Sequence, residues 1–246
     1  MADAFDRMEE LKDLLDLARQ EGDALAEAAA LYDIGRVYLK DKIWNRAEDF
    51  LAQCEQVCRA AGFLENLAQV LIDRAGAASA TQEAGRAEPL LREAGAVYEG
   101  LGQPQGRARV LDLLAEAALA RDDPEAALIA AGEGLALCRL HGDKVGAVYF
   151  LERVLPLLKQ AGLTAETAGA YRELITLAES LGDMERMALG LVGLADLYEK
   201  AGERKGAAPC LEMAHDLYLK LGKEREAGLV RAYLSQMGGG SQELEK

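Results

Sequence analysis

The sequence predicts an all-α fold, a stack of antiparallel helical hairpins with about twelve helices. Alanine and leucine are abundant among the 246 residues, only 5% are aromatic, and there are five prolines. This composition favours helices over β-strands. A glycine also recurs every forty residues after an apolar helical pattern, which indicates a repeat protein. The glycine series consists of Gly22, Gly62, Gly102, Gly142, Gly182 and Gly222.

Each glycine of the series is expected to end one helix and lead the chain into the next. Glycine suits the position after a helix because the backbone there is left-handed, a conformation that strains residues with a β-carbon. Asp23, Asp143 and Asp183 follow three of the glycines and are candidate N-caps. Pro104 suits the first turn of a helix. The series therefore predicts five turns between hairpins, preceded by one at Gly22.

A second set of breaks lies midway between the glycines, so each forty-residue unit is predicted to contain two helices. These breaks fall at residues 40–43, 121–124, 161–164 and 201–203, and a break without a clear cap falls at 80–85. The predicted organisation is an N-terminal capping helix at 1–23, five repeats at 24–63, 64–103, 104–143, 144–183 and 184–223, a C-terminal capping helix at 224–237 and a flexible tail at 238–246.

Large and small residues alternate at fixed sites when the units are superposed. Small residues let helix backbones approach, and large residues fill the spaces between them. The fourth unit departs from the pattern, because Leu155, Thr167 and Leu174 occupy sites where small residues are expected, and Pro156 predicts a kink or a local change of curvature. The large residues of the first helices are Leu31, Leu71, Leu111, Leu151 and Leu191.

Two units carry one motif most completely: a large residue, another large residue followed by a small one, an aromatic residue, and later a small, a large and a small residue. It reads Leu31, Ile34, Gly35, Tyr38, Ala47, Leu51 and Cys54 in the first unit, and Leu191, Leu194, Ala195, Tyr198, Ala207, Leu211 and Ala214 in the fifth. This motif resembles that of the tetratricopeptide repeat family. The forty-residue period is similar to that of kinesin light chains and Pins-type adaptors. The resemblance implies a right-handed superhelical solenoid.

The resemblance also implies that the first helix of each unit lines a concave groove where a partner binds. The residues expected to face inward mix apolar, acidic and basic types, which is typical of a groove for an amphipathic helix or an extended peptide. The candidate partner-binding residues are Tyr32, Arg36, Leu39, Gln69, Ile72, Asp73, Arg109, Asp112, Glu116, Tyr149, Glu152, Lys159, Leu189, Val192, Asp196 and Glu199.

Charge and hydropathy argue against several classes of partner. The chain has 42 acidic and 28 basic residues and a formal net charge of −14, so it should repel nucleic acids and anionic lipids and attract a basic polypeptide. No apolar run approaches the roughly 18 residues that span a bilayer, so membrane insertion is not expected. Four cysteines are too few for a disulfide framework and predict a reducing, cytoplasmic setting.

No enzymatic chemistry is indicated. The two histidines, His141 and His215, lie far apart in the sequence, and the phosphate-loop, HExxH and nucleophile-elbow motifs are missing. Cys54 and Cys58 are spaced like two metal ligands on one helix, but a zinc site needs two more. Packing is therefore the favoured interpretation of these thiols, and neither a metal nor a cofactor is expected.

The predicted function is a non-catalytic scaffold or adaptor that binds a peptide or helix of another protein. Two alternatives remain open. The chain could be a sensor module for a small molecule or a signalling peptide, or a structural repeat that associates with copies of itself.

Overall fold

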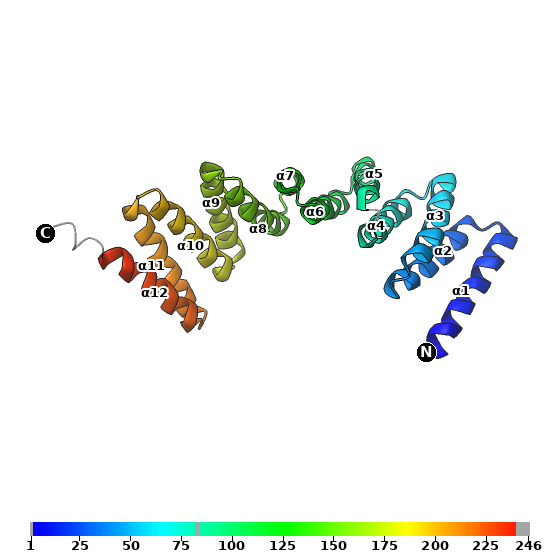
Figure 1. Cartoon of the computed structure of the whole chain (residues 1–246), viewed down its shortest axis with the longest axis horizontal. Helices are drawn as coiled ribbons and strands as arrows, with labels where there is room; N and C mark the ends of the chain where they lie inside the picture. The colour runs from blue at the N-terminus through cyan, green and yellow to red at the C-terminus, as the bar shows by residue number, and fades with distance from the viewer. Residues whose placement is uncertain (1, 82–83, 240–246) are drawn as a thin grey trace. The chain divides into compact units, whose positions relative to one another are not determined.

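The structure, a computed structural model, describes residues 2–81 and 84–239, and these residues fold into helices (Figure 1). They form twelve α-helices and one short 3-10 helix, without a strand. The all-α prediction is confirmed. The helices are α1 (Ala2–Glu21), α2 (Ala24–Lys40), α3 (Trp44–Ala61), α4 (Leu64–Ala80), η1 (Ala84–Arg86), α5 (Ala87–Gly100), α6 (Pro104–Ala120), α7 (Pro124–Leu140), α8 (Lys144–Gln160), α9 (Thr164–Leu181), α10 (Met184–Lys200), α11 (Arg204–Lys220) and α12 (Glu224–Gly239).

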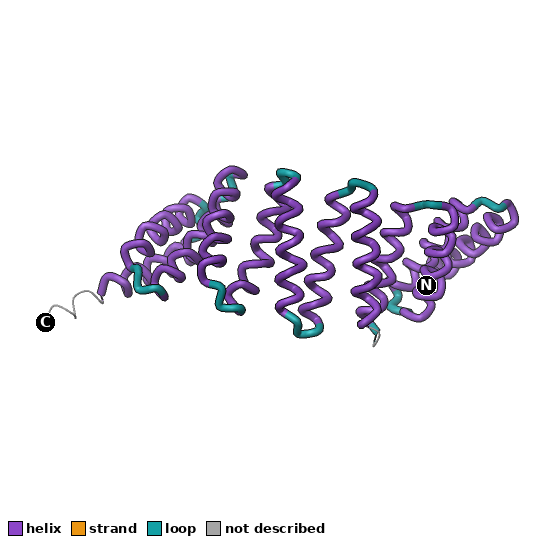
Figure 2. The backbone as a smooth tube through the Cα atoms, turned by 90° about the horizontal axis from the view of Figure 1, so that it is seen from above, coloured by secondary structure: helices purple, strands orange, loops and turns teal. Residues whose placement is uncertain are grey.

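The chain divides into two compact units, unit 1 (Met1–Leu137) and unit 2 (Cys138–Lys246). In unit 1 each helix from α1 to α6 packs on the next, and in unit 2 the same holds from α8 to α12. Short turns at alternate ends join neighbouring helices within each unit, so these neighbours run antiparallel (Figure 2). Among the residues described, no helix combines the length and the apolar character needed to cross a membrane.

The glycine series ends helices as predicted. All six of its members have φ between +65° and +76°, the left-handed region that favours glycine. Asp23, Asp143 and Asp183 each accept a hydrogen bond from a backbone N–H at the start of the following helix. These three N-caps, and Pro104 as the first residue of α6, are confirmed. The helix boundaries are therefore set by local backbone chemistry.

The midway breaks are also present. Gly162 and Gly202 are left-handed in two of them, and Lys42 and Asp122 take the same conformation in two others, with φ of 59° each. In the remaining break α4 ends at Ala80 and η1 precedes α5, while residues 82 and 83 lie outside the described part. The division into five repeats stays a prediction, although each predicted pair of helices is present.

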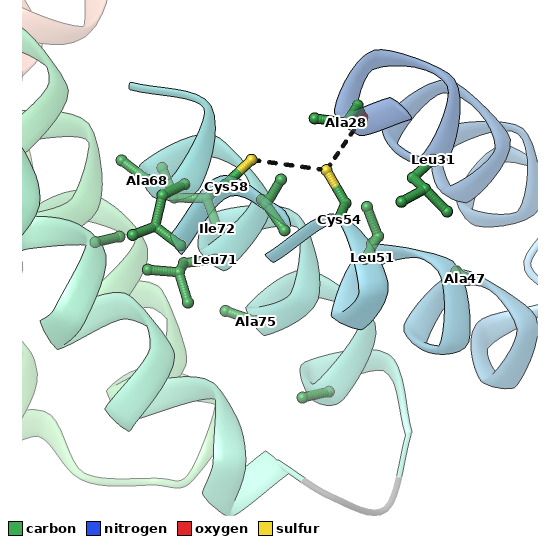
Figure 3. Packing of buried hydrophobic residues seen from close by; sticks show 14 of the residues in the cluster. Ala28, Leu31, Ala47, Leu51, Cys54, Cys58, Ala68, Leu71, Ile72 and Ala75 are labelled. Carbon is green, nitrogen blue, oxygen red and sulfur yellow. Dashed lines mark hydrogen bonds between the residues drawn. The ribbon is translucent and has the colours of Figure 1, made fainter. Parts of the chain in front are cut away.

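The leucines of the first helices are buried, as the alternation of large and small residues requires. Leu31, Leu71 and Leu151 have no exposed surface. Gly35 shows why a small residue stands four positions after Leu31, because a β-carbon there would lie 2.8 Å from side-chain carbons of Leu51. Figure 3 shows Leu31 of α2, Leu51 of α3 and Leu71 of α4 in one core. Helices α2 and α3 can therefore approach closely.

Helices α8 and α9, which form the predicted fourth repeat, accommodate their large residues by burying them. Leu155, Thr167 and Leu174 are 6%, 1% and 3% exposed. The Thr167 hydroxyl donates to the carbonyl oxygen of Leu163 at 2.6 Å, so the buried polar group has a partner. Helix α8 continues through Pro156, and the predicted change of curvature stays a prediction, as does the handedness of the superhelix.

The two ends of the chain differ slightly from the prediction. Helix α1 occupies most of the predicted 1–23 segment, and α12 continues to Gly239, two residues beyond the predicted end at 237. The rest of the predicted flexible tail, residues 240–246, lies outside the described residues.

Candidate functional site

The candidate partner-binding residues lie on first helices in both units. Unit 1 holds those of α2, α4 and α6, and unit 2 holds those of α8 and α10. The two sets have different chemistry.

In unit 1 a series of hydrogen bonds joins three successive first helices. The Tyr32 hydroxyl on α2 donates to Oδ2 of Asp73 on α4 at 2.8 Å. Nε2 of Gln69 on α4 donates to Oδ1 of Asp73 at 3.1 Å. Nη1 of Arg109 on α6 donates to Oε1 of Gln69 at 3.0 Å. These four residues, termed the polar chain, fix one another's orientation and so present an ordered polar surface.

Arg36 extends the polar chain at its α2 end. Its guanidinium carbon lies 5.7 Å from the centroid of the Tyr32 ring, within the range of a cation–π interaction. Burial, together with the hydrogen bond to Asp73, raises the pKa of Tyr32 well above its ordinary value. The Tyr32 hydroxyl therefore keeps its proton at neutral pH and acts as a donor to Asp73.

A hollow of about 530 Å³ lies between α4 and α6, next to the polar chain. This volume is within the roughly 300 to 1,000 Å³ typical of ligand pockets. Much of the lining is apolar, whereas Asp73, Arg109 and Glu116 supply charge. Five predicted candidates thus share one cavity: Leu39, Ile72, Asp73, Arg109 and Glu116. Asp112, a partly buried residue of α6, does not belong to this lining.

Eight residues that line the hollow were not among the candidates, Trp44 and Leu113 among them. Trp44 begins α3, a second helix, and a search restricted to first helices overlooks it. It is the only tryptophan in the chain, and this rarity is the feature of the sequence that could have identified it as a candidate. Leu113 lies on α6 beside the candidate Asp112, at a position whose orientation the repeat pattern leaves ambiguous.

The charged candidates of unit 2 form separate local contacts instead of one polar chain. Glu152 on α8 pairs with Arg186 on α10 at 2.8 Å, and Glu199 on α10 accepts a hydrogen bond from Tyr233 on α12. Lys159 differs from the other candidates, because its Nζ lies 5.2 Å from the ring centroid of Tyr171 on α9, a second helix. Asp196 pairs with Lys200 one turn further along α10, at 2.9 Å.

The apolar candidates of unit 2 are accessible. Tyr149 and Leu189 are 41% and 51% exposed, and Val192 is partly buried. The guanidinium carbon of Arg153 lies 5.2 Å from the Tyr149 ring centroid, and its Nη2 donates to the Tyr149 hydroxyl at 2.6 Å. The Tyr149 ring is therefore held in place while its surface stays available.

Net charge also separates the two units. Residues 1–137 contain 26 acidic and 14 basic residues, an excess of 12 acids, whereas residues 138–246 contain 16 acidic and 14 basic residues, an excess of two. Long-range attraction for a basic ligand is therefore concentrated in unit 1.

The cysteines of α3 are packing residues. Sγ of Cys54 donates to the carbonyl oxygen of Ala28 at 3.2 Å and lies 4.0 Å from Sγ of Cys58 (Figure 3). Burial raises the pKa of both thiols, so they are protonated at neutral pH. In the described part of the chain no three His, Cys, Asp or Glu side chains are grouped so that they could hold a metal ion.

We expect the cysteines of the native chain to react with a thiol reagent at different rates. Cys54, Cys58 and Cys138 are buried and Cys210 is only partly buried, so Cys210 should be modified first at pH 8. Denaturation in urea should make all four react rapidly. Mass spectrometry after timed alkylation measures the order, and rapid native modification of Cys54 would contradict the burial of α3.

The sequence matches no family model and no curated protein, but solved structures share its fold. BtubC (BKLC) from P. vanneervenii has a TM-score of 0.61 at 14% identity, with 89% of this chain and 92% of that chain covered. A Podosopora anserina putative kinesin light chain with nearly identical TPR-like repeats has a TM-score of 0.56 at 15% identity, with coverage of 78% and 95%. A Rap protein complexed with Competence and Sporulation Factor has a TM-score of 0.52 at 14% identity, with coverage of 98% and 72%. These likenesses confirm a tetratricopeptide-like fold.

Proposed function

We propose that this chain is a non-catalytic scaffold or adaptor that binds a basic peptide or helix of a partner protein along the first helices of unit 1. The observation that carries this proposal is the polar chain beside the 530 Å³ hollow. Ordered polar groups next to an apolar cavity can orient a polypeptide and bury one of its side chains. The excess of acidic residues in unit 1 favours a basic ligand.

Asp73 is the residue best placed to contact such a ligand. Its carboxylate accepts two hydrogen bonds, from Tyr32 and Gln69, and a carboxylate has about four acceptor sites. Lysine or arginine of the ligand can therefore donate to Asp73 while the existing bonds hold the carboxylate in position. An adjacent apolar side chain of the ligand would enter the hollow against Trp44 and Leu113.

Two further observations are consistent with the proposal. The Rap protein, which has this fold, was crystallised with Competence and Sporulation Factor, so the fold is able to carry a ligand. The four free thiols suit the cytoplasmic location that the sequence predicts.

The test begins with affinity capture from a native extract and synthesis of the captured partner's binding segment as a peptide. Tyr32→Ala and Asp73→Asn should each weaken binding of that peptide by about 1 to 3 kcal/mol, because both disturb a central polar contact. Asp73→Asn should also lower the association rate and its dependence on salt. Calorimetry and stopped-flow fluorescence measure the two effects.

The matched controls are Arg92→Ala on α5 and Glu133→Ala on α7, both second helices. They should leave the affinity for the peptide nearly unchanged. If only these control variants impair binding, and circular dichroism shows that every variant is folded, the first helices of unit 1 are not the binding surface.

The same experiment separates the two alternatives. A ligand that raises the melting temperature without any captured polypeptide would favour a small-molecule sensor. A molar mass that grows with protein concentration would favour self-association.

A further inference from the structure

A further pocket, of about 350 Å³, lies among α5, α6 and α7 in unit 1. We term it the second-helix pocket, because α5 and α7 are both second helices. The residues of α6 that line it are different from those that line the hollow beside the polar chain, so the two cavities lie on different faces of α6. Leu91, Val110 and Leu111 give the pocket a buried apolar base, and Ile129 adds an apolar side chain that is 58% exposed.

The forty-residue period shows why a pocket is present at this place. Forty residues earlier, Arg74 of α4 pairs with Glu55 of α3, and Arg86 pairs with Glu48 of α3. The residues equivalent to Arg74, Glu55 and Arg86 are uncharged and line the pocket: Leu114, Gly95 and Ala126, in that order. The pocket therefore occupies the space that charged side chains fill one period earlier.

The same comparison shows that a cation is missing at one side of the pocket. Forty residues earlier, Arg59 of α3 pairs with Glu93 of α5 at 2.6 Å and so links two second helices. The equivalent residues, Glu99 of α5 and Glu133 of α7, are both acidic and both line the pocket. Glu99 pairs instead with Arg107 of α6 at 2.8 Å. Among the described residues Glu133 has no ion pair or hydrogen bond with another side chain, so its carboxylate is unmatched.

The remaining charges that line the pocket are matched within the chain. Glu88 pairs with Arg92 at 2.7 Å and with Arg121 at 2.9 Å. A ligand therefore meets one unmatched charge, that of Glu133, next to an apolar base. The excess of 12 acidic residues in unit 1 also attracts a cation and repels an anion.

We propose that the second-helix pocket binds a small amphipathic amine, with its ammonium group between Glu99 and Glu133. This place is equivalent to that of the Arg59 guanidinium forty residues earlier, and the ammonium group forms a charge-assisted hydrogen bond with Glu133. The apolar body of the amine contacts Leu91 and Ile129. The volume of 350 Å³ is near the lower end of the range for ligand pockets, which suits one small molecule. The proposal does not depend on the proposed function, because none of the pocket's residues belongs to the polar chain.

The probe for the test is phenylbutylamine, which joins a primary ammonium group to an apolar body. Phenylbutanol and phenylbutyrate carry the same body with an uncharged and an anionic head. Titration of each compound with the full chain, followed by ligand-observed NMR at neutral pH, measures the three affinities. We expect a dissociation constant of about 1 mM or less for the amine. The alcohol should bind at least about threefold more weakly, and the acid more weakly still, because only the amine matches the charge of Glu133.

Glu133→Gln removes the unmatched charge and keeps the size of the side chain. It should weaken binding of phenylbutylamine about threefold and leave the affinity for phenylbutanol unchanged. Glu125→Gln is the matched control, because Glu125 is also an exposed residue of α7 but does not line the pocket. It should change neither affinity. Equal binding of the amine by the Glu133→Gln variant and the unchanged chain would overturn the proposal.

Gly95→Met should abolish binding of the amine, because it places a side chain in the pocket, as Glu55 reaches Arg74 forty residues earlier. A β-carbon at Gly95 would lie 3.4 Å from Cγ1 of Val110, an ordinary contact, so α5 should stay folded, which circular dichroism checks. Gly169→Met on α9 is the control, since a β-carbon there has open space, and it should bind the amine normally. Failure of the unchanged chain to bind the amine, equal affinities for the three compounds, or full binding by a folded Gly95→Met variant would each contradict the proposal.

Two variants of the polar chain distinguish this proposal from the proposed function. We expect Tyr32→Ala and Asp73→Asn to leave the affinity for phenylbutylamine unchanged. If Tyr32→Ala impairs binding of the captured partner while the amine does not bind, the proposed function stands and the second-helix pocket is not an amine site. If the amine binds as expected but both variants leave partner binding intact, the second-helix pocket stands and the site proposed along the first helices falls.

Discussion

Leu111→Asp should unfold part of unit 1 while unit 2 keeps its structure. Leu111 lies on α6 and is 6% exposed, so a carboxylate there loses its hydration and gains no partner. The expected destabilisation is about 3 to 5 kcal/mol. Helices of a stacked fold contact mainly their neighbours in sequence, so the loss should be concentrated around α5 and α6. Hydrogen exchange with mass spectrometry measures protection segment by segment.

Leu119→Asp is the control for this change, because Leu119 lies on the same helix but is 45% exposed. Its effect on the free energy of unfolding should stay within about 0.5 kcal/mol. Equal effects of the two substitutions, or a uniform loss of protection across both units, would show that burial and nearest-neighbour packing do not determine the response.

The fold could be predicted because its determinants are local. Gly62 ends α3 by adopting a left-handed conformation, and Asp23 caps α2 by accepting from two backbone N–H groups directly after it. Leu31 is buried at the centre of a helix face that the apolar periodicity identifies. The helix end, the N-cap and the buried position each depend on a few neighbouring residues, which can be read directly from the sequence.

The site could be predicted only in part, because its contacts depend on how the first helices are rotated and spaced. Asp33, Asp73 and Asp112 all occur near the motif leucines, yet it is Asp73 that accepts from Tyr32. Periodicity places a residue on a face within about a third of a turn, which is too coarse to select hydrogen-bond partners. Trp44 was overlooked for a related reason, since a second helix contributes to the hollow through its first residue.

A partly buried group of ion pairs in unit 1 was also not predicted. Arg74 on α4 has an 11% exposed side chain and pairs with both Glu48 and Glu55 of α3. Arg86, in η1, pairs with Glu48 from the other side at 2.9 Å. Glu48 and Glu55 are seven residues apart on α3, and both contact the guanidinium of Arg74 on α4. The repeat pattern does not specify which side chains of neighbouring helices form such contacts. The arrangement links α3, α4 and η1.

Arg74→Ala is expected to destabilise unit 1 by about 1 to 3 kcal/mol at neutral pH, because it removes the cation that two partly buried carboxylates share. Arg86 still pairs with Glu48 and Arg59 still pairs with Glu55, which limits the loss. Trp44, the only tryptophan of the chain, lies one turn before Glu48 on α3, so its fluorescence reports unfolding of this region. Urea titration followed by that fluorescence measures the loss.

The pH dependence of stability tests whether lost ion pairing causes the destabilisation expected for Arg74→Ala. Burial raises the pKa of Glu48, but the hydrogen bonds and charges of Arg74 and Arg86 together lower it further, so the pKa lies below its ordinary value. A carboxyl group with a lowered pKa in the folded state stabilises the protein above its unfolded pKa. This contribution disappears as the pH falls through the folded pKa. The difference in stability between the unchanged chain and Arg74→Ala should therefore shrink between about pH 5 and pH 3.

Arg92→Ala provides the comparison, because Arg92 is 72% exposed at its side chain and pairs with Glu88 one turn away on α5, at 2.7 Å. An exposed pair of this kind contributes about 0.5 kcal/mol or less. Arg92→Ala should thus leave the free energy of unfolding nearly unchanged at pH 7. If Arg74→Ala destabilises the chain as strongly at pH 3 as at pH 7, lost packing of the arginine side chain, and not the loss of charge pairing, accounts for the effect.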